Sequence, residues 1–140
     1  MTLKLILAVL AAAVVGFFLG WLVYGLLLTG FFEANMTSYD GLMKEDSPIW
    51  GYIIMNLSWG IMFVYVFHAL AGIKSFGKGF VAGLIITFLV VLSFDVSFFN
   101  SMNIFNFQAL IVDVIVSAVI GGLMAGVAAL ILGMGPKEEI

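Results

Sequence analysis

Two aspartates, Asp95 and Asp113, stand out in this sequence because each lies inside an otherwise apolar run. No lysine, arginine or histidine lies within either run. A carboxylate costs at least about 2.5 kcal/mol to place at the centre of a hydrocarbon layer, so acids inside membrane helices usually face a bundle interior or a water-filled cavity. The pair is therefore the first candidate for a functional site.

The chemistry open to such a pair depends on whether the two side chains meet. Two carboxylates close together in a low dielectric cannot both ionise readily, and such pairs share a proton or hold a cation. Oxygen atoms of Asn56, Tyr24 and Ser117 would suit a hard cation such as sodium if their helices face the pair. The alternative is structural, with Asp95 hydrated near its helix end and Asp113 hydrogen-bonded across the bundle.

Membrane helices are the segments that would carry these side chains. Hydrophobic residues make up 64% of the 140 residues and charged residues 9%, so too little polar surface is available to cover a water-soluble domain. Four apolar runs each exceed the roughly 20 residues that a helix needs to cross hydrocarbon. We predict an all-α, polytopic membrane protein with a single domain, residues 1–140, that is a bundle of four transmembrane helices over residues 5–32, 48–73, 79–99 and 107–134.

The start of the first run is similar to a secretory signal, with Lys4 before an apolar stretch that contains Ala11, Ala12 and Ala13. The run continues unbroken to Phe32, about twice the length of the apolar core of a signal peptide. We expect this segment to be retained as the first transmembrane helix.

The lysines predict an orientation, because positive residues near helix ends stay on the cytoplasmic side of a membrane. In a four-pass arrangement Lys44 falls on one side. The other lysines fall on the opposite side, namely Lys4, Lys74, Lys78 and Lys137. We therefore predict that both termini are cytoplasmic.

Counting from the outer helix ends predicts that several polar side chains share one layer of the bundle. Each of them lies roughly ten residues from an outer end, which at about 1.5 Å per residue is about 10 to 15 Å below the outer surface. They are Tyr24, Asn56, Asp95 and Asp113. Ser117 follows Asp113 by one helical turn and lies on the same face. These five residues are the candidate ligands for an ion, a proton or a small molecule.

His68, the only histidine, lies about 18 Å along its helix from Asn56, so we predict no metal site that combines it with the two acids. The sequence has no phosphate-binding Gly-Lys-Ser loop, no Gly-x-Ser-x-Gly elbow and no cysteine. We therefore predict neither enzymatic activity nor a cofactor. A net charge of −3 without a basic cluster argues against a nucleic-acid partner.

Glycines recur at four-residue spacing in three of the predicted helices, a pattern that lets membrane helices approach closely. They are Gly16, Gly20, Gly79, Gly83, Gly122 and Gly126. We predict that they pack the bundle itself, and a dimer interface is the alternative.

The stretch from Phe94 to Asn100, together with Val112-Asp113-Val114, resembles motifs of small four-helix bacterial integral membrane proteins of unknown function. Those proteins carry a Tyr-Asp-Leu-Thr-Asn-like motif in the third helix and a Val-Asp-hydrophobic motif in the fourth. The segment from Gly20 to Gly25 is similar to the Gly-x-x-Trp-Tyr segment of a related family. This chain departs from the first motif, since Phe94 replaces the tyrosine, Ser97 replaces the threonine and the asparagine comes two residues later.

The resemblance implies a helical fold in the bacterial inner membrane, with Asp95 and Asp113 as the matching acids, and it implies no activity. Two hypotheses follow. In the first, the protein is a small binding or transport module that holds a proton or cation at the carboxylates. In the second, it is an accessory subunit with structural aspartates. Membrane lipids are expected partners under both, with a homo-oligomer in the first and a larger membrane complex in the second.

Overall fold

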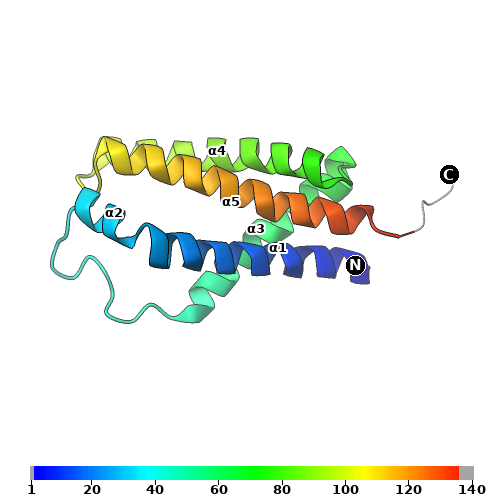
Figure 1. Ribbon diagram of the computed structural model, residues 1–140, viewed down its shortest axis with the longest axis horizontal. Coiled ribbons are helices and arrows are strands. Elements are labelled where there is room, and N and C mark those ends of the chain that lie inside the picture. The colour runs from blue at the N-terminus through cyan, green and yellow to red at the C-terminus, as the bar shows by residue number, and fades with distance from the viewer. Residues whose placement is uncertain (1, 136–140) are drawn as a thin grey trace.

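The computed structural model describes residues 2–135, and these residues form an all-helical structure (Figure 1). Its elements are α1 (Leu3–Leu22), η1 (Val23–Leu27), α2 (Thr29–Asn35), α3 (Ile49–Tyr65), η2 (Val66–Ala71), α4 (Phe76–Ser101) and α5 (Phe107–Gly133). In this part of the chain, four continuous helices are long and apolar enough to cross a membrane: Leu3–Leu27, Ile49–Ala71, Phe76–Ser101 and Phe107–Gly133. The predicted all-α chain with four such helices is therefore confirmed.

The first predicted helix, 5–32, was expected to be unbroken, and this was wrong. α1 continues into the π-helical turn η1, where the Leu28 N–H donates to the carbonyl of Val23, five residues back (2.8 Å). Leu28 then leaves helical geometry (φ −107°, ψ 5°), and α2 starts at Thr29. The Thr29 hydroxyl donates to the Tyr24 carbonyl (2.9 Å), which gives a partner to a part-buried backbone group at the break. The short helix α2 is thereby turned toward the α4–α5 connection (Figure 1).

The other helix boundaries differ less from the prediction. The second segment, 48–73, ends at Gly72, whose left-handed backbone (φ 62°) terminates η2 as a C-terminal glycine commonly does. The third, 79–99, is longer than expected, because α4 begins at Phe76 and runs to Ser101. Gly79, at the predicted start of this helix, is a buried residue inside α4 that lies against α5. The fourth segment, 107–134, ends one residue earlier, at Gly133.

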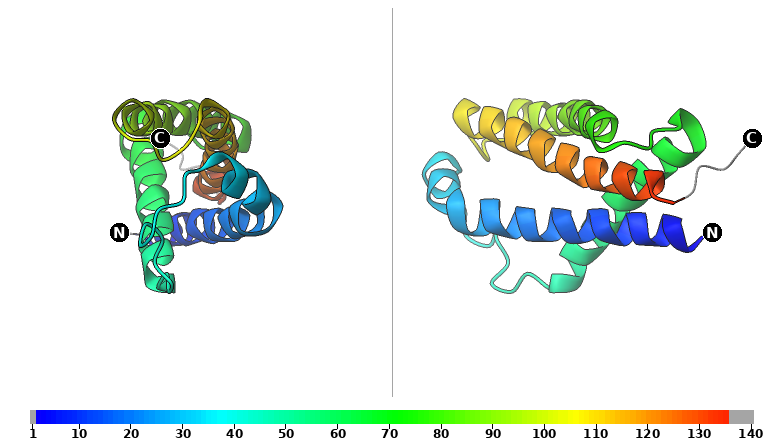
Figure 2. Two further views of the ribbon diagram at one scale, coloured as in Figure 1. Left: turned by 90° about the vertical axis from the view of Figure 1, so that its left-hand side faces the viewer. Right: turned by 45° about the vertical axis from the view of Figure 1, so that its right-hand side comes forward.

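The helices pack unequally. α4 and α5 lie side by side, α1 packs against α5, and α3 crosses α1 and α5 diagonally (Figures 1 and 2). Fully buried Phe63 and Phe67 fill the space between α1 and α5 where these helices meet α3 and η2. The core is therefore concentrated toward the end of the bundle where the chain begins, and large apolar side chains cover the outside, as a lipid solvent allows.

The glycines set how closely α4 and α5 approach. A Cβ atom added to Gly83 would meet the Ala125 side chain and the Gly121 carbonyl oxygen, and Gly79 lies in the same way against Ala125 and Ala129. Because glycine has no side chain, the backbones of α4 and α5 can approach closely at these two positions, as they commonly do at small residues in membrane proteins.

Of the remaining predicted packing glycines, three lie at helix contacts and one does not. Gly122 and Gly126 on α5 lie against aromatic rings of α4, and Gly16 on α1 lies against Asn56 and Met124. Gly20 was expected at a helix contact, but an added Cβ atom there would have nothing within 4 Å. α3 crosses α1 diagonally (Figure 2), and its residues Asn56 and Gly60 lie against Gly16 and Val9 of α1.

Charged residues separate between the two ends of the bundle. α1 begins and α5 ends at one end, where Lys4, Lys74 and Lys78 are also located (Figure 1). Lys44 lies in the connection between α2 and α3 at the other end, and this exposed connection also carries Asp40, Glu45 and Asp46. Lys137 lies outside the described residues.

Candidate functional site

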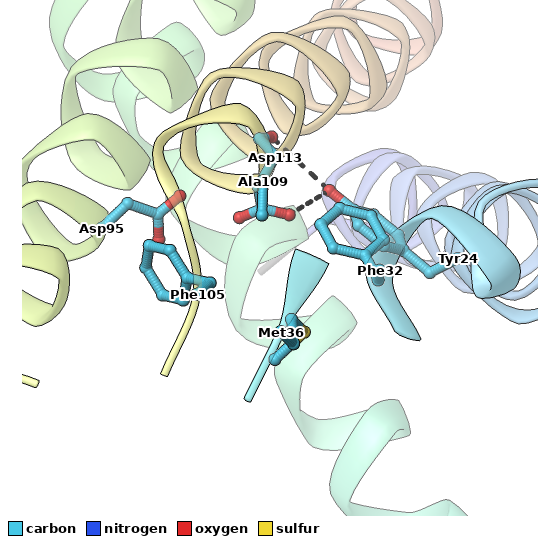
Figure 3. A pocket seen from close by; sticks show the side chains of 7 residues that line it. All are labelled: Tyr24, Phe32, Met36, Asp95, Phe105, Ala109 and Asp113. Atoms are coloured by element: carbon cyan, nitrogen blue, oxygen red, sulfur yellow. Dashed lines mark hydrogen bonds between the residues drawn. The ribbon is translucent and has the colours of Figure 1, made fainter. Parts of the chain in front are cut away.

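A cavity of about 290 Å³ lies where α2 and the α4–α5 connection meet the helices that carry the two aspartates (Figure 3). Because a water molecule takes about 30 Å³ in the liquid, this space is large enough for several waters or a small organic molecule. Its lining residues are Tyr24, Phe32, Met36, Asp95, Phe105, Ala109 and Asp113.

Asp113 is held by hydrogen bonds from another helix. The Tyr24 hydroxyl, on η1, donates to Asp113 Oδ1 (2.6 Å), and a second bond joins the Tyr24 and Ser117 hydroxyls (2.9 Å). The Tyr24 hydroxyl has a single proton and donates it in the hydrogen bond to Asp113. The Ser117 hydroxyl is therefore the donor in the second hydrogen bond. Asp113 and Ser117 lie one turn apart on α5, so both face η1. This network fixes one carboxylate oxygen and ties the first span to the last.

Tyr24, which bonds to Asp113 and Ser117, lies in the π-helical turn η1. Such turns are rare, and they occur often at functional sites because they alter the direction of side chains within a helix. The break at Leu28 returns α2 beside the end of η1, so that the Phe32 ring lies against the Tyr24 ring, with centroids 5.5 Å apart. Tyr24 is therefore positioned both by its hydroxyl and by its ring.

Asp95 approaches from α4, and its carboxyl group points toward that of Asp113 (Figure 3). Both residues line the same cavity. Asp95 Oδ2 is buried and has no hydrogen-bond partner among the described residues. None of the described side chains that line the cavity is basic. The lining therefore supplies two acids and no positive charge to balance them.

A short backbone pairing covers this end of the cavity. Met36 and Phe105 form an isolated antiparallel bridge. Two backbone hydrogen bonds flank it: the Thr37 N–H donates to the Ile104 carbonyl (2.6 Å), and the Asn106 N–H donates to the Asn35 carbonyl (3.0 Å). The Asn106 side chain also donates to Asn35 Oδ1 (2.6 Å) and accepts from the Ala109 N–H (2.9 Å). It thereby caps α5 as well. The bridge holds Met36 and Phe105 in the lining.

Sequence reasoning missed four lining residues, Phe32, Met36, Phe105 and Ala109. Each lies near or beyond a predicted helix end, in an apolar or aromatic context that is ordinary for a membrane interface. The Asn106 cap before a helix is visible in the sequence, but the pairing of residue 36 with residue 105 depends on the break at Leu28. No local pattern in the sequence indicates that pairing.

Asn56 does not reach the other four predicted ligands. It is buried near Gly16, donates from Nδ2 to the Tyr52 carbonyl (2.8 Å) and lines a separate cavity of about 220 Å³. Counting depth from helix ends assumed upright helices, whereas α3 crosses the bundle diagonally. His68 lies in η2 and lines a third, apolar cavity toward the other end. No group of three metal-ligating side chains is found among the described residues.

The structure therefore brings together Tyr24, Asp95, Asp113 and Ser117, and it leaves Asn56 apart. The resemblance to small four-helix bacterial membrane proteins, which rests on short motifs around the two aspartates, stays a prediction. Comparisons with family models, with curated proteins and with solved structures find no match for this chain.

Proposed function

We propose that this protein is a small membrane binding or transport module that holds a proton or a cation between Asp95 and Asp113. One observation carries the proposal: two carboxyl groups from different helices line one cavity, and no basic side chain lines it among residues 2–135. Acids inside a membrane are costly unless they are protonated or paired with a positive charge. A bound proton or cation supplies what the lining lacks.

The two aspartates have different surroundings, which suits different roles. Asp113 is oriented by Tyr24, while Asp95 Oδ2 has no partner among the described residues. In the proposed site Asp113 is the fixed acceptor, and Asp95 is the group that gains or loses a partner when the ligand enters or leaves. Because Asp113 is already held in place, only Asp95 has to be ordered when the ligand binds, which lowers the entropic cost of binding.

The location belongs to the same proposal. We propose that the chain spans the bacterial inner membrane with both termini in the cytoplasm. The support is the grouping of Lys4, Lys74 and Lys78 at one end of the bundle, because lysines near helix ends favour the cytoplasmic side. The cavity then lies in the outer half of the membrane.

Thermal unfolding of the purified protein in detergent tests the carboxylate site. Acidification or added sodium should raise the unfolding temperature of the wild type, because a ligand that binds only the folded state stabilises it, by about 2.7 kcal/mol at a hundredfold excess over Kd. Asp113→Asn should abolish this response. Asp40→Asn, in the exposed α2–α3 connection, is the matched control and should keep it. An unchanged response in Asp113→Asn would refute the proposal and favour an accessory subunit with structural aspartates.

A further inference from the structure

The cavity has two chemically different sides. The carboxyl groups of Asp95 and Asp113 form one side. The other side is apolar and aromatic, with Phe105 toward Asp95, Phe32 toward Asp113 and Met36 between the rings (Figure 3). A ligand that fills this space has to satisfy negative charge at one end and aromatic or thioether surface around the rest.

An inorganic cation satisfies the first side and leaves the second unused. Hard cations take about six or more oxygen ligands, whereas the oxygen atoms open to a ligand here are those of the two carboxyl groups. The Tyr24 hydroxyl is already bonded to Asp113 and Ser117. The nearby carbonyls of Tyr24, Asn35 and Ile104 also accept hydrogen bonds within the protein. Water would have to complete the shell against phenylalanine and methionine side chains.

An organic ammonium ion matches both sides. Its positive charge balances a carboxylate, and its alkyl groups pack on the rings, whose faces attract cations held within about 6 Å of the ring centroid. When the two acids share one proton, a single negative charge remains, which corresponds to one monovalent ammonium. A cavity of about 290 Å³ is far larger than a bare metal ion and accommodates several alkyl groups around a nitrogen.

From these observations we infer that the ligand of this cavity is a small alkylammonium ion, held by Asp95 and Asp113 and enclosed by Phe32, Phe105 and Met36. This inference rests on the proposed cation site and specifies its ligand. The Asp95 carboxyl group, which lines the cavity, is the group that the ammonium ion pairs with. Phe32 and Phe105 distinguish an alkylammonium ion from sodium or a proton, because only the former uses their ring faces.

Choline and its uncharged carbon isostere, dimethylbutanol, are the probes for this inference. Binding is measured by thermal unfolding and by calorimetry in a maltoside detergent, which contains no ammonium group. Choline should stabilise the wild type and dimethylbutanol should not, and Asp113→Asn should abolish the effect of choline. Phe105→Leu removes a ring face but keeps an apolar side chain, and it should weaken choline binding about tenfold without changing the response to protons or sodium. Phe88→Leu, on the exposed surface of α4, is the control and should bind choline like the wild type.

The outcomes separate the ligand from the site. A response to protons or sodium that depends on Asp113, without a response to choline, overturns the alkylammonium ligand and leaves the cation site standing. Equal responses to choline and dimethylbutanol also overturn it, because charge would then play no part. Absence of any Asp113-dependent response overturns the proposed function itself. A short-chain phosphatidylcholine distinguishes the sources: stabilisation by this lipid but not by free choline identifies a headgroup as the ligand, and stabilisation by choline identifies a free ammonium compound.

Discussion

At the scale of single residues, the Tyr24 hydroxyl is the group that joins the first membrane span to the last. Tyr24→Phe removes its hydrogen bonds with Asp113 and Ser117 while keeping the ring against Phe32. Hydrogen bonds between membrane helices average about 0.6 kcal/mol and reach about 1.7 kcal/mol. We expect the free energy of unfolding to fall by about 1 kcal/mol, measured by denaturant unfolding in mixed micelles.

Tyr52→Phe is the control for this change, because Tyr52 is half exposed on α3 and lies outside the cavity. A double-mutant cycle of Tyr24→Phe with Asp113→Asn should show that the two losses are not additive. If Tyr24→Phe unfolds like Tyr52→Phe, the hydroxyl network contributes nothing to stability and Asp113 is not held by it.

The residues that form the site show how much of it can be predicted from the sequence. Polar residues are so rare in apolar helices that Asp95, Asp113, Tyr24 and Ser117 could be selected by residue type and one-turn spacing alone. Asn56 meets the same criteria and lies elsewhere, because the direction of a helix within the bundle determines which face its residues meet. Helix direction follows from many weak packing contacts, which a single sequence does not display.

At the scale of helices, the close approach of α4 and α5 depends on the absence of side chains at particular positions. Gly83→Ala would place a methyl group against Ala125 and the Gly121 carbonyl, and overpacking of this kind costs about 1–3 kcal/mol. Gly20→Ala would enter open space and gain up to about 1 kcal/mol of helix propensity. We expect the first change to lower the unfolding temperature in detergent, and the second to leave it unchanged or raise it.

These two substitutions are chemically identical, so the difference between them isolates packing. Equal effects would mean that the α4–α5 approach is not limited by Gly83. The sequence placed both glycines in the same class by their four-residue spacing. The spacing identifies which residues are able to lie at a contact, and only the course of the neighbouring helix decides which of them do.

The break in the first membrane span at Leu28 is the feature of the helices that is hardest to predict from the sequence. Residues 5–32 are predominantly apolar and carry no charged side chain, so hydropathy predicts one long helix. The backbone departs from it through a π-helical turn, a Thr29 side-chain bond and a return path that lets Met36 pair with Phe105. The sequence therefore predicts the number of spanning helices well, while the cover of the cavity depends on a local change of geometry that hydropathy does not detect.

At the scale of the whole molecule, the orientation of the bundle decides from which side of the membrane the cavity is reached. The chain has no cysteine, so single cysteines can be placed and labelled without background. Asp40→Cys lies in the exposed connection near the cavity end, and Ser75→Cys lies at the lysine-rich end. With cytoplasmic termini, a membrane-impermeant maleimide should label Asp40→Cys in intact cells and should label Ser75→Cys only after permeabilisation. The reverse pattern would place the cavity in the inner half of the membrane, and an alkylammonium ion would then reach Asp95 and Asp113 from the cytoplasm.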